Sequence, residues 1–151
     1  MDVVQLVVFR LGDCEYAVAI DQVQEILNVV DITRVPRAPY YILGVFNLRG
    51  KIQPAIDLQL RLGLGRTEIQ DGSRLVVVKV QEHVVGLLVD AVLETTQVER
   101  ADIEPAAVMM GSVAQELVQG IVKIGDRLLT WLDLSSAVAK EGDDAAERQV
   151  G

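Results

Sequence analysis

The chain has 151 residues, of which 50% are hydrophobic, and its formal net charge is −8. An acidic chain with few aromatic residues repels phosphate backbones, which excludes a nucleic-acid binding protein. Charges interrupt the apolar runs well before the ~18 residues that a membrane span requires. The single cysteine, Cys14, rules out an internal disulfide, and the start of the chain carries no secretion signal. We therefore expect a cytoplasmic protein with no direct membrane insertion.

The chain begins with a pattern that is typical of a β-hairpin. Residues 3–9 and 15–20 are rich in apolar and β-branched side chains, and Gly12-Asp13 between them is a turn signal. The following segment, residues 21–27, predicts a short helix that Asp21 would cap. Its apolar side chains recur at helical spacing and would share one face: Val23, Ile26 and Leu27.

The next segment is extended and then forms a second hairpin. Pro36 and Pro39 forbid a helix and favour an extended edge followed by a turn. Residues 44–58 predict two strands around a turn at residues 49–51. Asp57 is then placed to cap a second short helix, which the glycines shortly after it would end.

The order of these elements recurs in the second half of the chain. Residues 6–26 match residues 75–95 without a gap at an offset of 69, and residues 44–58 match residues 120–134 at an offset of 76. The first match aligns three informative pairs: Leu6 with Leu75, Asp21 with Asp90, and Glu25 with Glu94. A duplication of two β-rich units explains this recurrence better than chance similarity between valine-rich strands.

Each unit has about five predicted short strands, enough to close a small barrel. Two such barrels would bury a joint hydrophobic core, because a single unit of this size has a poor surface-to-volume ratio. The predicted fold is therefore mainly β, with subdomains over residues 1–70 and 71–140 and with exchange of strands between them allowed. The remaining residues, 141–151, are acidic, and their composition predicts a disordered tail.

The sequence contains no recognisable catalytic, metal or cofactor site. One histidine, His83, and one cysteine cannot supply a usual zinc set, and both fall beside predicted hairpin turns. The segment from Gly44 to Lys51 differs from a phosphate-binding loop in its glycine spacing, and Ile52 stands where such a loop needs Ser or Thr. We therefore expect no enzyme, no metal and no cofactor.

Three stretches in order, YAVAIDQVQEIL, DITRVPRAP and GVFNLRGKIQPAIDL, resemble the bacterial chemotaxis coupling protein family (CheW-like). The resemblance runs from about Val3 to Lys140. It implies two SH3-like five-stranded β-barrels that share a hydrophobic core. It also implies a non-catalytic adaptor that joins the cytoplasmic tips of methyl-accepting chemoreceptors to the regulatory domain of a CheA-type histidine kinase, recruited to receptor arrays at the inner membrane.

The same resemblance implies two groups of contact residues. The receptor-binding group would consist of Val23, Glu25, Ile26, Gly44 and Arg49. The group for kinase or ring contacts would consist of Glu104, Pro105 and Met109. Met109-Met110 departs from the aromatic residue often found there in the family. Two alternatives stay open: Arg49 either contacts a partner or holds its own turn, and Val23 and Ile26 are either core residues or exposed contacts.

Two other functions compete with this interpretation. One is a coupling protein of a parallel chemosensory-type pathway, for example in twitching motility, which only the identity of its kinase and receptors would distinguish. The other is a small metabolite-binding β-barrel, which should have a sizeable apolar pocket with a few convergent polar groups. A core filled by side chains between the barrels would argue against the second.

Overall fold

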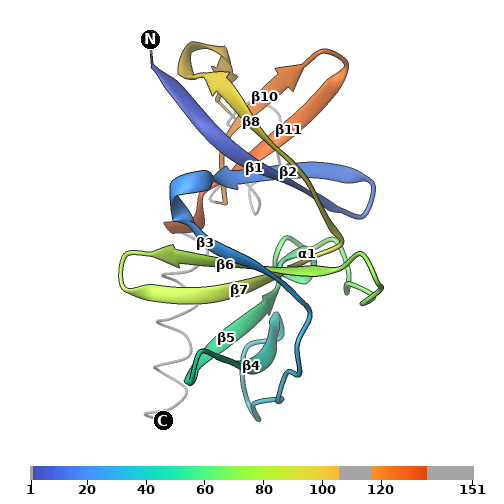
Figure 1. Ribbon diagram of the computed structural model, residues 1–151. Coiled ribbons are helices and arrows are strands. Elements are labelled where there is room, and N and C mark those ends of the chain that lie inside the picture. The colour runs from blue at the N-terminus through green and yellow to red at the C-terminus, as the bar shows by residue number, and fades with distance from the viewer. Residues whose placement is uncertain (1, 106–116, 136–151) are drawn as a thin grey trace.

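The computed structural model describes residues 2–105 and 117–135, and most of them lie in β-strands (Figure 1). The predicted tail, residues 141–151, and Met109 lie outside the described residues. The strands are β1 (Val3–Leu11), β2 (Cys14–Ala19), β3 (Val23–Asn28), β4 (Ile42–Leu48), β5 (Lys51–Asp57), β6 (Arg74–Val80), β7 (His83–Val89), β8 (Ala91–Glu99), β9 (Ile103–Glu104), β10 (Val118–Ile124) and β11 (Arg127–Leu132). The helical turns are η1 (Ile20–Gln22), α1 (Leu58–Arg61) and η2 (Arg100–Asp102).

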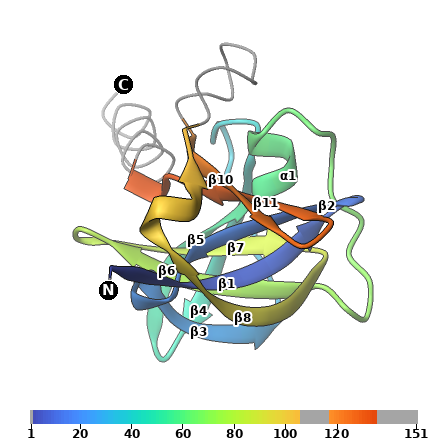
Figure 2. The ribbon, with the colours of Figure 1, turned by 90° about the horizontal axis from the view of Figure 1, so that it is seen from above.

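The strands form two curved sheets, one above the other in Figure 1. The upper barrel is a six-stranded sheet in the order β8-β1-β2-β11-β10-β9, and the lower barrel is a five-stranded sheet in the order β3-β6-β7-β5-β4. Seen from above, β1 and β2 lie over β6 and β7 (Figure 2). The predicted fold class is thereby confirmed, with one extra strand in the upper barrel, the two-residue β9.

Each barrel contains strands from both halves of the chain. The N-terminal hairpin β1–β2 belongs to the upper barrel, and β3 to β5 belong to the lower barrel, where β3 pairs with β6. In the second half, β6 and β7 lie in the lower barrel and β8 returns to pair with β1. The second crossing is fixed at Asp90, whose Oδ2 accepts a hydrogen bond from the Gly12 N–H at 2.6 Å. The predicted boundary at residue 70 thus concerns the sequence units, while the sheets mix strands of both.

The sequence repeat corresponds to equivalent backbone geometry in the two barrels. Leu6 pairs with Ala19 on β1–β2, and Leu75 pairs with Leu88 on β6–β7, so both partners shift by the same offset. In the second repeated stretch, the Asp57 N–H donates to the Tyr41 carbonyl and the Asp133 N–H donates to the Leu117 carbonyl, each at 2.8 Å. The duplication inferred from the sequence therefore extends to hydrogen bonding.

A shared hydrophobic core joins the two barrels. On β1, Phe9 and Leu11 face this shared core, whereas Leu6 and Val8 face the interior of the upper barrel. On β6 the equivalent alternation sends Val76 to the shared core and Leu75 to the interior of the lower barrel. Strands that are buried on both faces need continuous apolar sequence, which explains why β1 and β6 lack polar alternation.

The helix predicted over residues 21–27 is wrong, and the second predicted helix is confirmed. Residues 23–28 instead form β3, an edge strand that pairs with β6 through a β-bulge between Val23 and Glu25. The bulge adds one residue to the two-residue period of the strand. Side chains three positions apart therefore fall on the same face and imitate helical spacing. The second helix, α1, begins after Asp57, whose side chain accepts from the Leu60 N–H at 3.2 Å.

Candidate functional site

The β4–β5 hairpin carries a tight turn that contains the most distinctive sequence of the chain. Arg49 and Gly50 connect the two strands with φ angles of 54° and 86°. Positive φ at both central residues is the requirement of a two-residue hairpin turn of type I′. The Gly50 N–H also donates to Asn47 Oδ1 at 2.8 Å. Asn47 and Gly50 therefore fix the turn from which the Arg49 side chain projects.

Arg49 forms an ion pair with Glu25, a residue of β3. The distance from Arg49 Nη2 to Glu25 Oε2 is 3.0 Å, and the side chains are 79% and 23% exposed. The guanidinium thus joins the hairpin tip to a strand far away in sequence, while most of its surface stays open to solvent. An exposed guanidinium with free donors can accept a further carboxylate from a partner.

The remaining predicted receptor residues on β3 do not share a face with Glu25. Residues that pair directly across two strands point to the same side of the sheet. Glu25 pairs with Val77, which faces the interior of the lower barrel, whereas Ile26 pairs with Val76, which faces the shared core. Ile26 is 43% exposed, and Val23 is partly buried against the shared core. Ile26 is thus available to a partner, and Val23 mainly packs.

Gly44 is buried within β4 and is not itself exposed to a partner. Its φ of 152° and its surroundings both require glycine, because a Cβ at this position would lie 2.1 Å from the Thr33 carbonyl oxygen. The backbones of Thr33 and Val45 exchange two hydrogen bonds of 2.8 Å beside it. Gly44 therefore allows the segment that begins at Thr33 to pack directly on β4.

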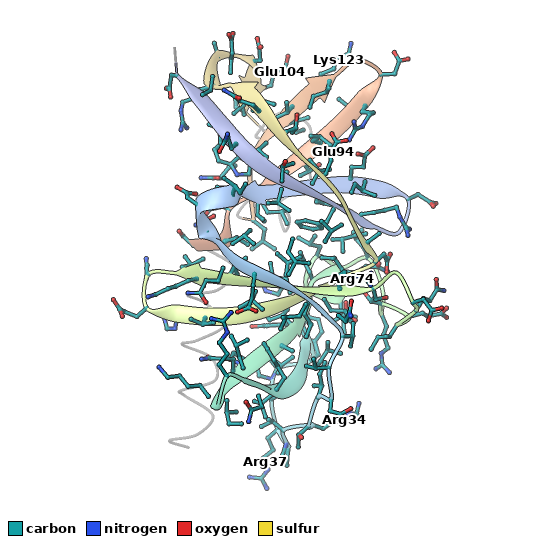
Figure 3. The ribbon with its side chains drawn as sticks, in the orientation of Figure 1. Arg34, Arg37, Arg74, Glu94, Glu104 and Lys123 are labelled. Atoms are coloured by element: carbon teal, nitrogen blue, oxygen red, sulfur yellow. The ribbon has the colours of Figure 1, made fainter. Side chains whose placement is uncertain are left out.

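The predicted kinase or ring contacts lie on the other barrel. Glu104 is exposed on β9, which pairs with β10 of the upper barrel, and Pro105 follows it on the surface. Figure 3 shows Glu104 near the top of the molecule, far from Arg34 and Arg37 at the lower end. Met109 cannot be placed with them, since it lies outside the described residues. The described members of the kinase or ring group, Glu104 and Pro105, are thus on the upper barrel, whereas the predicted receptor group lies on the lower barrel.

A second ion-pair cluster, which the sequence did not predict, lies on the upper barrel. Arg127 Nη2 lies 2.6 Å from Glu15 Oε1, and its Nη1 lies 3.3 Å from Glu94 Oε1. The hydrogen bonds to Glu15, together with the one to Glu94, raise the pKa of the Arg127 guanidinium above its usual value. The one sequence feature that could have indicated this cluster is the repeat, because it aligns Glu94 with Glu25.

The described residues contain few groups that are typical of a catalytic or metal site. Cys14 is exposed at the start of β2, and His83 takes the equivalent place on β7. Within residues 2–105 and 117–135, no group of three or more His, Cys, Asp or Glu could hold a metal ion. Among the described residues, apolar side chains of both barrels pack against one another between the barrels, which argues against the metabolite-binding alternative. No helix in the described part of the chain is long and apolar enough to cross a membrane.

Comparison with known proteins identifies the family. The model of the CheW-like domain matches residues 5–141. A chemotaxis protein CheW from Rhizobium meliloti is 37% identical over 142 residues, covering 94% of this chain and 92% of the relative. The protein FrzA of Myxococcus xanthus is 35% identical over 115 residues, covering 76% of this chain and 71% of the relative. The crystal structure of the scaffolding protein TtCheW from Thermoanaerobacter tengcongensis superposes with a TM-score of 0.79 at 37% identity, covering 87% of this chain and 84% of that one.

The chain therefore belongs to the CheW-like family of chemotaxis scaffold proteins. The match spans both barrels and includes every residue of the two predicted contact groups. Family membership supports the prediction that the chain is not an enzyme, because this family consists of non-catalytic scaffolds.

Proposed function

We propose that this chain couples methyl-accepting chemoreceptors to a CheA-type histidine kinase. One surface binds the cytoplasmic tips of the receptors, and another binds the regulatory domain of the kinase. The protein acts in the cytoplasm, where it is recruited to receptor arrays at the inner membrane. Weak individual contacts suit this role, because an array raises the effective concentration of each binding partner.

The observation that carries the proposal is the exposed ion pair between Arg49 and Glu25 in a chain matched to CheW-like proteins over nearly its full length. Arg49 sits on a two-residue turn held by the Gly50–Asn47 hydrogen bond, so the backbone that presents its guanidinium is already ordered before a partner carboxylate binds. Ile26 supplies exposed apolar surface on the neighbouring strand. A receptor surface that combines carboxylates with apolar side chains would complement this region.

The placement of Glu104 and Pro105 supports a separate kinase or ring surface. Both residues are exposed on the upper barrel, whereas Arg49 and Glu25 belong to the lower barrel. A chain with two partners needs surfaces that can be occupied together. Met109 belongs to the same proposed surface on the basis of sequence alone.

A second candidate is the coupling protein of a parallel chemosensory-type pathway. The similarity to FrzA supports this candidate, because FrzA is a relative that is not named a chemotaxis protein CheW. The two candidates share the adaptor mechanism and differ in the identity of kinase and receptors.

Isothermal titration calorimetry tests the proposal. The purified chain is titrated with the isolated regulatory domain of the chemotaxis kinase of its own organism and, separately, with a receptor tip fragment. We expect saturable one-to-one binding to the regulatory domain, and binding to the receptor fragment that weakens in Arg49→Ala. Binding only to the kinase of a parallel pathway would instead establish the second candidate, and no binding to any of these partners would refute both.

A further inference from the structure

Gly120 lies on β10 at the place where β9 packs against that strand. The residue is buried, and its φ is not among the positive φ angles of the glycines, so its own backbone conformation does not require glycine. A Cβ at this position would overlap Ile103 Cγ2 and would lie 3.0 Å from the Glu104 carbonyl oxygen. Glycine is therefore needed here for space, because β9 approaches β10 too closely for a side chain.

Strand β9 holds Glu104 in place through very little backbone. It has two residues, which pair with β10: Glu104 lies opposite Ile121, and Ile103 lies opposite Val122. Successive side chains of a strand point to opposite sides. Ile103 is partly buried against the upper-barrel cluster that contains Trp131, and Glu104 is exposed. Ile103 thus anchors β9, and the position of this anchor determines where Glu104 is presented.

The Ile103 side chain has little room to avoid a Cβ at position 120. Isoleucine branches at its own Cβ, so its Cγ2 lies close to the backbone and moves only with a change of χ1. A new rotamer would have to fit against Trp131, whose backbone pairs with Gly120 on the other side of β10. A side chain at Gly120 would therefore displace Ile103 and, with it, the backbone of Glu104.

The lower barrel contains the same arrangement. The sequence repeat makes Gly44 equivalent to Gly120 at the offset of 76. The residue after Gly44 pairs with Thr33, and the residue after Gly120 pairs with Glu104. A Cβ on Gly44 would meet the Thr33 backbone, whereas a Cβ on Gly120 would first meet the Ile103 side chain. In each barrel a glycine thus makes room for a segment that packs on the following strand pair, and in the upper barrel that segment carries Glu104.

We propose that Gly120 is a positioning residue for the kinase or ring surface: it seats β9 on β10 and thereby sets where Glu104 meets the regulatory domain of the kinase. This inference rests on the proposed function and adds the residue that holds one of its contact residues in place. Gly120 acts without touching the partner, because it is buried. A side chain at this position should change kinase binding and leave the receptor surface of the lower barrel intact.

Nuclear magnetic resonance of the full chain tests whether Gly120 seats β9. In the parent we expect nuclear Overhauser contacts between the backbone protons of Glu104 and Ile121, which pair directly. In Gly120→Ala these contacts should be lost, while the contacts between β6 and β7 should persist. Unchanged contacts between Glu104 and Ile121 would show that β9 keeps its place without glycine, which would overturn the inference.

Isothermal titration calorimetry with the regulatory domain of the kinase tests the effect on binding. We expect Gly120→Ala to weaken this binding about tenfold or more and to bind the receptor tip fragment like the parent. The matched control is Gly86→Ala, in which the new Cβ would lie 2.8 Å from Phe46 Cε1 in the lower barrel. This control disturbs packing without touching β9, so it should bind the regulatory domain like the parent.

A double-mutant cycle separates positioning from a general structural effect. In a Glu104→Ala background, Gly120→Ala should weaken kinase binding much less than it does in the parent, because the carboxylate that it misplaces is already absent. Equal weakening in both backgrounds would overturn the inference, since Gly120 would then not act through Glu104.

A second pair of changes applies even where Gly120→Ala does not fold. Ile103→Ala removes the Cγ2 atom that the new Cβ would overlap. The double variant with Gly120→Ala and Ile103→Ala should therefore fold and should bind the regulatory domain more tightly than Gly120→Ala alone. A double variant that keeps the contacts between Glu104 and Ile121 but shows no gain in binding would overturn the inference.

Failure of the proposed function gives a different pattern. If the parent does not bind the regulatory domain, the proposed function and the binding role of Gly120 are both refuted. If the parent binds and Gly120→Ala binds equally well despite a displaced β9, only the role of Gly120 is refuted.

Discussion

Glu25 and Glu94 occupy equivalent places in the two barrels, and each forms an ion pair with an arginine near the hairpin of its own barrel. Glu25 pairs with Arg49 in the β4–β5 turn, and Glu94 pairs with Arg127 at the start of β11. The arginines are not equivalent in the repeat, because Gly125 corresponds to Arg49 and Arg127 corresponds to Lys51. Equivalent glutamates in the two barrels are thus paired with arginines from two different positions of the repeat.

The two bridges differ in how much guanidinium remains available to a partner. Arg127 has two carboxylates and a side chain that is 37% exposed, while Arg49 has Glu25 and is 79% exposed. Arg127 therefore serves mainly to hold β2, β8 and β11 together. Arg49 keeps the larger accessible surface, in keeping with its proposed contact role.

Alanine substitution should separate these roles. Arg49→Ala should lower the free energy of unfolding by less than about 1 kcal/mol, because exposed ion pairs contribute little, and it should weaken receptor binding while kinase binding persists. Arg127→Ala should lower the melting temperature more than Arg49→Ala does. Calorimetric melting and titration of both variants check this. A large loss of stability in Arg49→Ala, with loss of both partners, would assign it a structural role instead.

Gly86 should tolerate no side chain, whereas Gly72 should tolerate one. A Cβ on Gly86 would lie 2.8 Å from Cε1 of the buried Phe46 ring, while a Cβ on Gly72 would meet no atom closer than 3.5 Å. Gly86→Ala should therefore destabilise the protein by about 1–3 kcal/mol through overpacking. Gly72→Ala should change stability by no more than about 1 kcal/mol. Urea denaturation of both variants measures the difference, and equal stabilities would contradict it.

Asp57 should stabilise the loop at Thr67 as well as cap α1. It is fully buried, and its carboxylate accepts from the Thr67 N–H at 2.9 Å and the Thr67 hydroxyl at 2.7 Å, in addition to Leu60. Asp57→Asn replaces one acceptor oxygen by a donor, so a buried donor loses its partner at a cost of about 1–3 kcal/mol. Thr67→Val removes only the hydroxyl and should cost less. Thermal unfolding ranks the variants, and a larger loss in Thr67→Val would contradict this assignment.

The shared core should make the two barrels unfold together. Phe9→Ala removes a fully buried ring of that core and should destabilise the protein by about 3–5 kcal/mol. Fluorescence of Trp131, the single tryptophan, reports on the upper barrel, and hydrogen exchange of β6 amides reports on the lower. We expect both probes to give the same loss of stability. Separate transitions would show that each barrel is stable alone.

Local patterns predicted most of the strands because turn residues and apolar runs are local properties. Gly12-Asp13 and the turn at Arg49 and Gly50 indicated their hairpins correctly, and the offset of 69 indicated the duplication that the matching register of β1–β2 and β6–β7 reflects. The error over residues 21–27 has a definite cause. β3 is extended because it pairs with β6, which is distant in sequence. The bulge in β3 also interrupts the two-residue alternation by which a strand is recognised in a sequence.

The candidate site was less predictable for the same reason. The Arg49 turn could be recognised from its own residues, but the bridge to Glu25 depends on where β3 lies in three dimensions. The role of Gly44 could not be inferred from sequence either, because the clash that a side chain would cause involves Thr33, eleven positions earlier (44 − 33). Contacts between elements that are distant in sequence leave little trace in either one.

The exchange of strands between the barrels has an evolutionary consequence. Each half of the chain sends its first hairpin to one barrel and its remaining strands to the other, so neither half can complete a barrel from its own strands. Two copies of a half-length ancestor could build the same architecture as a symmetric homodimer, each copy lending its hairpin to the other. Gene fusion would then have joined two mutually dependent subunits, leaving the modern halves free to diverge into unlike binding surfaces.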